Sequence, residues 1–186
     1  MRVSREQVAI NRQAILKAAS RLFRERGYDA VTVADVMNAA GLTHGGFYGY
    51  FKSKDELIEQ TLAHVFAEGE GGASDLARYA ASYLSPEHRD NVADGCPMAA
   101  LGAETVRQTP EARAAMASGI ERQIARFSAG MKTANAATAR QAAIGGWAAM
   151  VGAVVLARLC DDPMLSDEIL TATRAWIVEH EAAKRG

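Results

Sequence analysis

The 186-residue chain has few of the residues that mark several classes of protein. Its two cysteines, Cys96 and Cys160, cannot form a disulfide framework and are not spaced as metal ligands. Its four histidines are scattered, and it has neither a phosphate-cradling glycine loop nor a nucleophile elbow. The N-terminus lacks the apolar core of a signal peptide. We therefore expect a cytoplasmic protein that is not an enzyme and uses no metal or cofactor.

Regular alternation of polar and apolar residues, which would indicate strands, is also missing. Hydrophobic residues make up 49% of the chain and charged residues 23%, which is ordinary for a soluble globular protein. The most apolar run, residues 142–159, is interrupted by three glycines and Arg158, so it suits a buried helix better than a membrane span. These features predict an all-α protein that does not contact a membrane.

The net charge of −1 hides an uneven distribution of charge. Residues 1–54 contain nine basic and four acidic residues, a net charge of +5, whereas the remainder carries −6. A basic segment favours binding to nucleic acid, because each neutralised phosphate releases a counterion. The distribution indicates an N-terminal part that faces phosphates, although ordinary solvated helix faces would produce the same charge.

The segment 32–54 contains the signals of a helix-turn-helix motif. Thr32 begins a capping box before a helix over residues 33–40, and Gly41 supplies the left-handed residue that ends this helix. Thr43 can then cap a second short helix. Two helices joined by a turn of about three residues that contains glycine are typical of this motif, whose second helix enters the DNA major groove.

Supporting helices are predicted on both sides of the motif. Apolar residues recur at helical spacing over residues 10–26, and Gly27 ends this helix. A second apolar pattern over residues 57–66 follows a capping box that opens at Ser53. We expect the first of these helices to pack across the motif and complete a three-helix head. The glycine-rich residues 68–72 are the predicted hinge to the body.

The remainder of the chain is predicted to be helical, for a total of about nine helices. The expected elements are a helix capped by Ser74 that ends at residue 84, a polar loop over residues 87–94, helices over residues 97–108, 110–132 and 138–160, and a last helix capped by Ser166.

The predicted helix over residues 138–160 is apolar nearly all round, so something outside its own protomer should cover one of its surfaces. A four-helix bundle formed with a two-fold mate would cover it, and would place two recognition helices about one DNA turn apart. The alternative is a central helix that is enclosed within the monomer. The residues expected at the dimer interface are Gly145, Gly146, Ala149, Gly152, Ala153, Trp176 and Ile177.

Several short sequences between residues 8 and 69 match a known pattern. They are Ile15-Leu16-Ala18-Ala19, Leu22-Phe23, Gly27-Tyr28, Thr32-Val33-Ala34, Ala40-Gly41-Leu42 and the run from Gly46 to Leu57. Through them the chain resembles the TetR family of bacterial transcriptional regulators. The resemblance implies a homodimer whose helical body binds a small molecule and thereby changes the spacing of the two heads. Residues 9–69 would form the DNA-binding domain, with its helix-turn-helix at 32–51, and residues 73–186 the ligand-binding and dimerisation domain.

Candidate DNA contacts follow from the motif. Thr43 and His44 lie at the start of the recognition helix and can reach base edges, although His44 could instead be solvated or structural. Gly45 and Gly46 permit close approach of the backbone. The residues expected to contact phosphates are Thr32, Tyr48, Tyr50, Lys52 and Lys54, together with Arg5 in an N-terminal arm that could equally be a solvated tail.

An effector pocket is expected among the body helices. Its candidate lining residues, each of which could instead belong to an ordinary core, are Tyr79, Tyr83, Met98, Met116, Phe127, Trp147 and Met150. Cys96 precedes Pro97 at a predicted helix N-terminus, where the helix dipole favours a thiolate. It is therefore either a thiol that senses electrophiles or oxidants, or a small structural residue.

The sequence thus predicts a ligand-responsive transcriptional regulator. We expect a repressor that binds a palindromic operator in double-stranded DNA as a homodimer and is released by a small molecule or by modification of a thiol. The alternatives are a helical adaptor that binds another protein and, with least support, a small helical enzyme.

Overall fold

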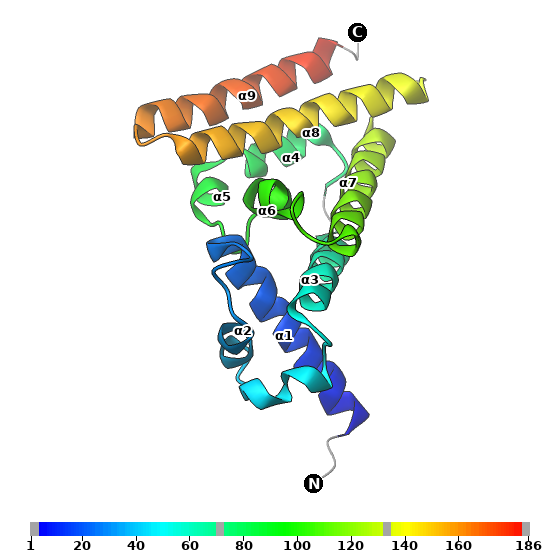
Figure 1. Ribbon diagram of the computed structural model, residues 1–186. Helices are drawn as coiled ribbons and strands as arrows, with labels where there is room; N and C mark the ends of the chain where they lie inside the picture. The colour runs from blue at the N-terminus through cyan, green and yellow to red at the C-terminus, as the bar shows by residue number, and fades with distance from the viewer. Residues whose placement is uncertain (1–3, 70–72, 132–134, 184–186) are drawn as a thin grey trace.

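The computed structural model describes residues 4–69, 73–131 and 135–183, and within these ranges it contains helices and no strand (Figure 1). This confirms the predicted all-α fold. The elements are α1 (Arg5–Arg26), α2 (Val33–Ala39), the 3₁₀ helix η1 (His44–Gly49), α3 (Lys54–Glu68), α4 (Leu76–Tyr83), α5 (Pro86–Asp90), α6 (Pro97–Thr105), α7 (Pro110–Gly130), α8 (Ala136–Leu159) and α9 (Pro163–Ala183).

The helices form a small head and a larger body (Figure 1). In the head, α2 and η1 pack against each other, and α1 packs on α2 and α3. From the head, α3 leads toward the body and lies along α7, while α8 and α9 run antiparallel across the far end. The short helix α6 lies between these layers and contacts α1, α7 and α8.

The core of the head continues into the body. Phe23, Phe47 and Phe51 are fully or almost fully buried within the head, and they belong to the same core as Leu101 of α6 and Met116 of α7. A second core lies between α4, α7, α8 and α9. The head is therefore packed directly onto α6 and α7, so a displacement of α6 must be transmitted to the head or be opposed by it.

Several predicted helix starts are wrong by a few residues. The first helix begins at Arg5, because the Ser4 side chain accepts a hydrogen bond from the backbone N–H of Gln7 and caps it. Arg5 therefore lies in a helix rather than in an extended arm. Helix α4 is capped by Asp75, which accepts from the N–H of Arg78, and not by Ser74.

Two proline residues begin helices at positions that the sequence patterns did not reveal. The segment that starts at Pro86 forms α5 rather than a loop, and α9 begins at Pro163, because proline is tolerated in the first turn, where its missing N–H is not needed. Ser166 is consequently inside α9 and does not cap it. It is buried, and its hydroxyl donates to the carbonyl of Ala157 at 2.7 Å. The predicted hinge falls mainly on residues 70–72, which lie outside the described residues.

Candidate DNA-binding surface and effector cavity

The first helix of the motif has the predicted capping box. The hydroxyl of Thr32 accepts a hydrogen bond from the backbone N–H of Asp35 at 3.1 Å, and the Asp35 carboxylate accepts from the N–H of Thr32 at 2.8 Å. The hydrogen bonds from Thr32 lower the pKa of the Asp35 carboxyl. Gly41 follows α2 with a φ of +71°, which glycine adopts without steric cost. These local interactions fix the direction in which the chain enters the recognition helix.

The recognition helix itself is η1, a short 3₁₀ helix. Thr43 precedes it in an extended conformation but makes no side-chain capping bond, so its predicted capping role is wrong. The adjacent Gly45 and Gly46 have low helix propensity, which is consistent with a short turn instead of a longer α-helix. Phe47 is fully buried and stacks on Phe51, which anchors η1 to the head.

The exposed face of η1 presents the predicted contact residues. His44 and Gly45 are exposed at its start, and the side chain of Tyr48 is 75% exposed. The Tyr50 hydroxyl accepts a hydrogen bond from the Asn11 amide at 2.8 Å, which holds the ring against α1 and leaves the hydroxyl hydrogen able to donate. Arg12 of α1 lies over the Phe51 ring at 4.7 Å and adds a cation beside the motif.

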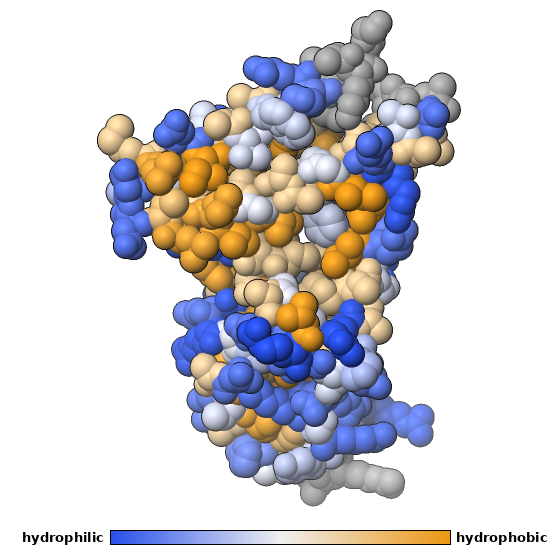
Figure 2. Space-filling view, turned by 45° about the horizontal axis from the view of Figure 1, so that its top comes forward, coloured by the Kyte–Doolittle hydropathy of each residue, from blue (hydrophilic) through white to orange (hydrophobic). Residues whose placement is uncertain are grey.

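The remaining predicted contacts surround this face. Thr32 and Lys52 are exposed, Lys54 is half-buried, and Arg5 is exposed on the first turn of α1. The backbone N–H of Lys52 donates to the Glu56 carboxylate at 2.6 Å, so the chain between η1 and α3 is held in place. The surface of the head is mainly hydrophilic (Figure 2). These residues form a polar, basic surface that DNA phosphates could approach.

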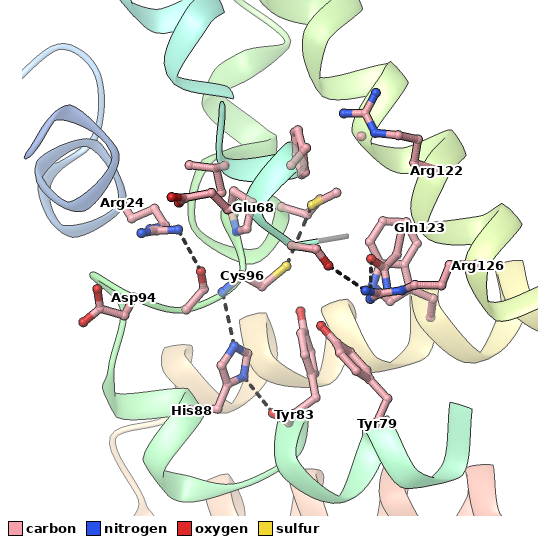
Figure 3. Close-up of a pocket in the computed structure, with 18 of the residues that line it drawn as sticks. Arg24, Glu68, Tyr79, Tyr83, His88, Asp94, Cys96, Arg122, Gln123 and Arg126 are labelled. Carbon is pink, nitrogen blue, oxygen red and sulfur yellow. Dashed lines mark hydrogen bonds between the residues drawn. The ribbon is translucent and has the colours of Figure 1, made fainter. Parts of the chain in front are cut away.

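A cavity of about 930 Å³ lies between the head and the body helices. Residues from α1, α3, α4, α5, α6, α7 and α8 line it, together with the turn that leads into α6 (Figure 3). Of the candidate residues, Tyr79, Tyr83, Cys96, Met98 and Trp147 line the cavity. This volume is in the range of cavities that hold small organic ligands.

The other three predicted lining residues are packed elsewhere. Met116 belongs to the core that the head shares with α7, whereas Phe127 and Met150 are fully buried in the core of the body. They were wrongly assigned because an apolar side chain in a helix gives no sign of whether its neighbour is a cavity or another helix. Sequence reasoning also missed polar lining residues, notably His88, Gln123 and Arg126.

A half-buried histidine holds the turn that carries Cys96. The Nδ1 atom of His88 lies 2.7 Å from the carbonyl of Tyr83, and its Nε2 lies 3.2 Å from the backbone N of Cys96 (Figure 3). Because the Cys96 N–H donates to Nε2, the ring is neutral and carries its hydrogen on Nδ1. Burial lowers the pKa of His88, which favours this neutral form. The Cys96 thiol lies 3.8 Å from the sulfur of Met98.

The tyrosines of α4 form one wall of the cavity. Their rings stack at 5.4 Å, and their hydroxyls point toward Cys96 and the polar residues of α7 (Figure 3). Burial raises the pKa of Tyr79 to about 12 and raises that of Tyr83 further, so both hydroxyls keep their hydrogens at neutral pH. Tyr83 is 3% exposed, and its hydroxyl has no hydrogen-bond partner among the described residues.

The turn before α6 and the helix itself also hold the end of α1. Arg24 donates to the carbonyls of Ala93 and Gly95 at 2.7 and 3.2 Å, although burial lowers the pKa of its guanidinium. The Glu104 carboxylate accepts from the backbone N–H of Tyr28 at 2.8 Å, and the Tyr28 hydroxyl lies 3.0 Å from that of Thr105. The segment that carries Cys96 at the cavity wall is thus bonded to the head.

The far end of the body carries exposed apolar residues. Leu156, Leu159, Met164 and Leu165, at the end of α8 and the start of α9, are 46–81% exposed, and hydrophobic surface gathers at the body in Figure 2. By length and hydropathy α8 would also suit a membrane span, a property that core helices of soluble proteins share. Exposed apolar area of this kind is typical of a protein–protein interface.

Some residues predicted at the dimer interface are buried within the protomer. Gly146 lies under Leu76 of α4, whose side chain leaves no room for a Cβ atom, and Ala153 and Ile177 are also buried. These three positions are therefore removed from the predicted interface. Gly145 and Trp176 are exposed, while Ala149 and Gly152 are partly buried.

Among the described residues, no group of three or more His, Cys, Asp or Glu side chains is placed to hold a metal ion.

Comparison with protein families matches nearly the whole chain. Residues 15–61 match the family model described as bacterial regulatory proteins, tetR family. Residues 72–173 match the model described as tetracyclin repressor-like, C-terminal domain, and this match alone covers more than half of the chain.

Curated relatives resemble the head alone. The HTH-type transcriptional repressor KstR2 of Mycolicibacterium smegmatis is 39% identical over 56 residues, which are 30% of this chain and 27% of that protein. The HTH-type transcriptional regulator TtgR of Pseudomonas putida is 37% identical over 62 residues, 33% of this chain and 30% of that protein. The chain thus aligns with less than a third of the length of these relatives.

Solved structures resemble the fold of the whole chain. The reduced form of E. coli NemR superimposes with a TM-score of 0.72 at 22% identity, covering 90% of this chain and 94% of that one. A TetR transcriptional regulator from Legionella pneumophila gives a TM-score of 0.71 at 17% identity, covering 97% and 99%. At these identities the likeness establishes the shared arrangement of helices.

Proposed function

The chain belongs to the tetR family of bacterial regulatory proteins, and from this premise we propose that it is a cytoplasmic transcriptional repressor. It binds a palindromic operator as a homodimer and leaves the DNA when a small molecule occupies the cavity between head and body. The observation that carries this proposal is a set of hydrogen bonds, from Arg24 of α1 to the turn at the cavity wall and from the backbone of Tyr28 to Glu104 of α6, since they connect an effector site to the DNA-binding head.

The roles within the head follow from exposure. His44 is exposed at the start of η1 and reads base edges, whereas Lys52, Lys54 and Tyr48 hold the head on phosphates. The glycines at 45 and 46 let the backbone approach the groove closely. The 3₁₀ helix is short, so few side chains can specify bases and most of the affinity comes from phosphate contacts.

The homodimer is formed by α8 and α9. The exposed apolar residues at the end of α8 and the start of α9 become buried against the same residues of a two-fold mate, which removes apolar area from water. Gly145, Ala149, Gly152 and Trp176 lie along these helices and extend the contact. Dimerisation then fixes the distance between the two heads, which a palindromic operator requires.

Release of DNA begins at the turn before α6. A ligand that displaces the turn bearing Cys96 also displaces Ala93 and Gly95, the two carbonyls that hold Arg24. Because Glu104 and Thr105 hold Tyr28 at the other end of α6, the head moves with the helix. A ligand produces this shift only to the extent that it binds the displaced state more tightly than the DNA-binding state.

Modification of Cys96 is a second trigger for release. The thiol lines the cavity at the N-terminus of α6, where an added group would press on the same turn. Intact-mass measurement after mild peroxide or a quinone, with Cys96→Ser for comparison, tests this route. Absence of an adduct on Cys96 together with unchanged DNA binding would leave the small molecule as the trigger.

DNA binding is tested with a duplex from the region upstream of the gene for this protein. In gel shift and fluorescence anisotropy, Lys54→Ala should weaken binding to every duplex and reduce the slope of log K against log salt by about 0.9 for each phosphate that the head no longer neutralises. His44→Ala should instead change the preferred sequence. Arg107→Ala in the body serves as the control. The absence of salt-dependent binding to any palindromic duplex would refute the repressor and favour an adaptor that binds protein.

A further inference from the structure

Three polar groups at the cavity, one from α4 and two from α7, have an unusual shared property. Three buried polar atoms of cavity-lining residues have no hydrogen-bond partner among the described residues: the Tyr83 hydroxyl, the Gln123 Nε2 and the Arg126 Nε. The nitrogen atoms are donors only, and the Tyr83 hydroxyl keeps its hydrogen. A buried donor without an acceptor costs about 1–3 kcal/mol, so groups of this kind are normally satisfied. The two nitrogen atoms lack an acceptor, and the only described group that interacts with the Tyr83 hydroxyl in this way is the weakly polar Cys96 thiol.

The acceptor groups already in place explain why these atoms remain unpaired. The Arg126 guanidinium donates through its two terminal nitrogens, to the Gly69 carbonyl at 2.7 Å and to Gln123 Oε1 at 2.8 Å (Figure 3). These bonds fix the guanidinium and turn the amide of Gln123 so that its nitrogen is left without a partner. Both acceptors are neutral, so within the described residues the positive charge of Arg126 is not matched by a hydrogen-bonded carboxylate.

The charges around the cavity have a positive balance. Arg24, Arg122 and Arg126 line it, against the two carboxylates of Glu68 and Asp94. Asp94 pairs with Arg21, which does not line the cavity, and Glu68 lies 3.5 Å from His64, which is charged only when it is protonated. An anionic ligand group is therefore favoured over a cationic one.

The other walls of the cavity are aromatic and apolar. The stacked rings of Tyr79 and Tyr83 face it from α4, and Phe66, Met98 and Trp147 line it from α3, α6 and α8. The Arg126 guanidinium lies 5.6 Å above the Tyr79 ring, which places the cation at the edge of the aromatic wall. A flat apolar body fits beside such rings.

We infer that the cavity binds an aromatic carboxylate, with its ring system against Tyr79, Tyr83 and Trp147 and its carboxylate accepting from Gln123 and Arg126. A carboxylate has two acceptor oxygens and the charge that complements Arg126, and its bonds to these donors are charge-assisted. The inference rests on the proposed function in one respect only, that the cavity is the effector site.

The test uses calorimetric titration of the purified full chain with a panel of one-, two- and three-ring arenes. Each ring system, such as naphthalene, is supplied as the 2-carboxylate, the neutral 2-carboxamide and the methylammonium cation. We expect at least one carboxylate to bind about tenfold more tightly than its carboxamide, since about 1.4 kcal/mol corresponds to that factor, and no methylammonium compound to bind measurably.

Substitutions assign this preference to the named donors. Gln123→Leu and Arg126→Met should each reduce carboxylate affinity about tenfold and change carboxamide affinity little, while Arg113→Met, on the exposed face of α7, should match the unaltered chain. Equal binding of carboxylate and carboxamide, a preference for the cation, binding of no compound, or a carboxylate preference that survives Arg126→Met would overturn the inference.

DNA binding, measured separately by anisotropy, keeps the two proposals apart. Operator binding without carboxylate selectivity refutes only the inferred ligand class. Carboxylate binding without operator binding refutes only the proposed repressor.

Discussion

Replacement of Gly27 by alanine tests the contact between the head and α6 with a single methyl group. Gly27 ends α1 with φ +80° and ψ 168°, a conformation that is essentially restricted to glycine. A Cβ atom at this position would lie 2.6 Å from Oε1 of Glu104 and 2.8 Å from its Oε2. The same carboxylate accepts the backbone N–H of Tyr28. The methyl group must therefore displace Glu104 and break this bond.

Two separate costs follow from Gly27→Ala. The backbone conformation costs about 1–3 kcal/mol for a residue with a Cβ atom. Loss of the hydrogen bond to a charged acceptor adds about 1.5–3 kcal/mol, so we expect the free energy of unfolding to fall by roughly 3–6 kcal/mol. Gly41→Ala should cost only the backbone part, because nothing lies within 4 Å of a Cβ there and its φ is +71°.

A double-mutant cycle separates the two costs. In a Glu104→Ala background the methyl group meets no carboxylate and the Tyr28 bond is already absent, so Gly27→Ala should cost about 1.5–3 kcal/mol less than in the unaltered chain. Urea unfolding at one fixed protomer concentration supplies the values, since a dimer's stability depends on concentration. If the two substitutions are simply additive, Glu104 does not hold the end of α1 and the proposed route from cavity to head is wrong.

Three further predictions concern the cavity and the dimer. Burial lowers the pKa of His88, so below pH 6.5 the unfolded chain takes up a proton more readily than the folded chain does. The contribution of His88 to the free energy of unfolding is therefore complete above pH 6.5 and falls as the pH decreases below that value. His88→Gln should flatten the curve of unfolding free energy against pH in that window. Tyr83→Phe removes a buried hydroxyl without a hydrogen-bond partner and should raise the free energy of unfolding by about 1–3 kcal/mol, while carboxylate binding changes little because the ring is kept; lower stability would show that the hydroxyl has a partner. Leu159→Glu replaces an exposed apolar side chain at the end of α8 and should yield a monomer in light scattering. Val106 is also exposed and apolar but lies at the end of α6, so Val106→Glu should remain dimeric. A dimer in both variants would place the interface elsewhere.

The head could be predicted from the sequence because its signals are local. The capping box at Thr32, the left-handed Gly41 and the terminal Gly27 each act within a few residues of the chain, and the structure has all three. The recognition helix was harder, because two adjacent glycines weaken an α-helix and no local pattern distinguishes a 3₁₀ helix from a short α-helix. The Thr43 cap failed for that reason.

The cavity could be predicted only in part, because it is defined by contacts distant in sequence. Tyr79 and Tyr83 were found by their aromatic character, but the same criterion selected Phe127, which is core. Gln123 and Arg126 lie on α7 among ordinary polar residues, and only the packing of the helices brings them to the cavity. A polar residue on an amphipathic helix is solvated in most proteins, so no sequence pattern distinguishes these two from their neighbours.

Helix α8 shows why some of the residues predicted at the dimer interface are buried within the protomer. Its buried residues recur at helical spacing, as do its exposed ones, so the helix has two faces although both are apolar. A pattern of hydrophobicity cannot separate two apolar faces, and the prediction therefore relied on small residues as sites of close approach. Gly146, however, serves the protomer itself, because Leu76 occupies the space above it. Large apolar side chains such as Leu156 and Leu159 identify the other face, because they are exposed to water and no described part of their own protomer covers them.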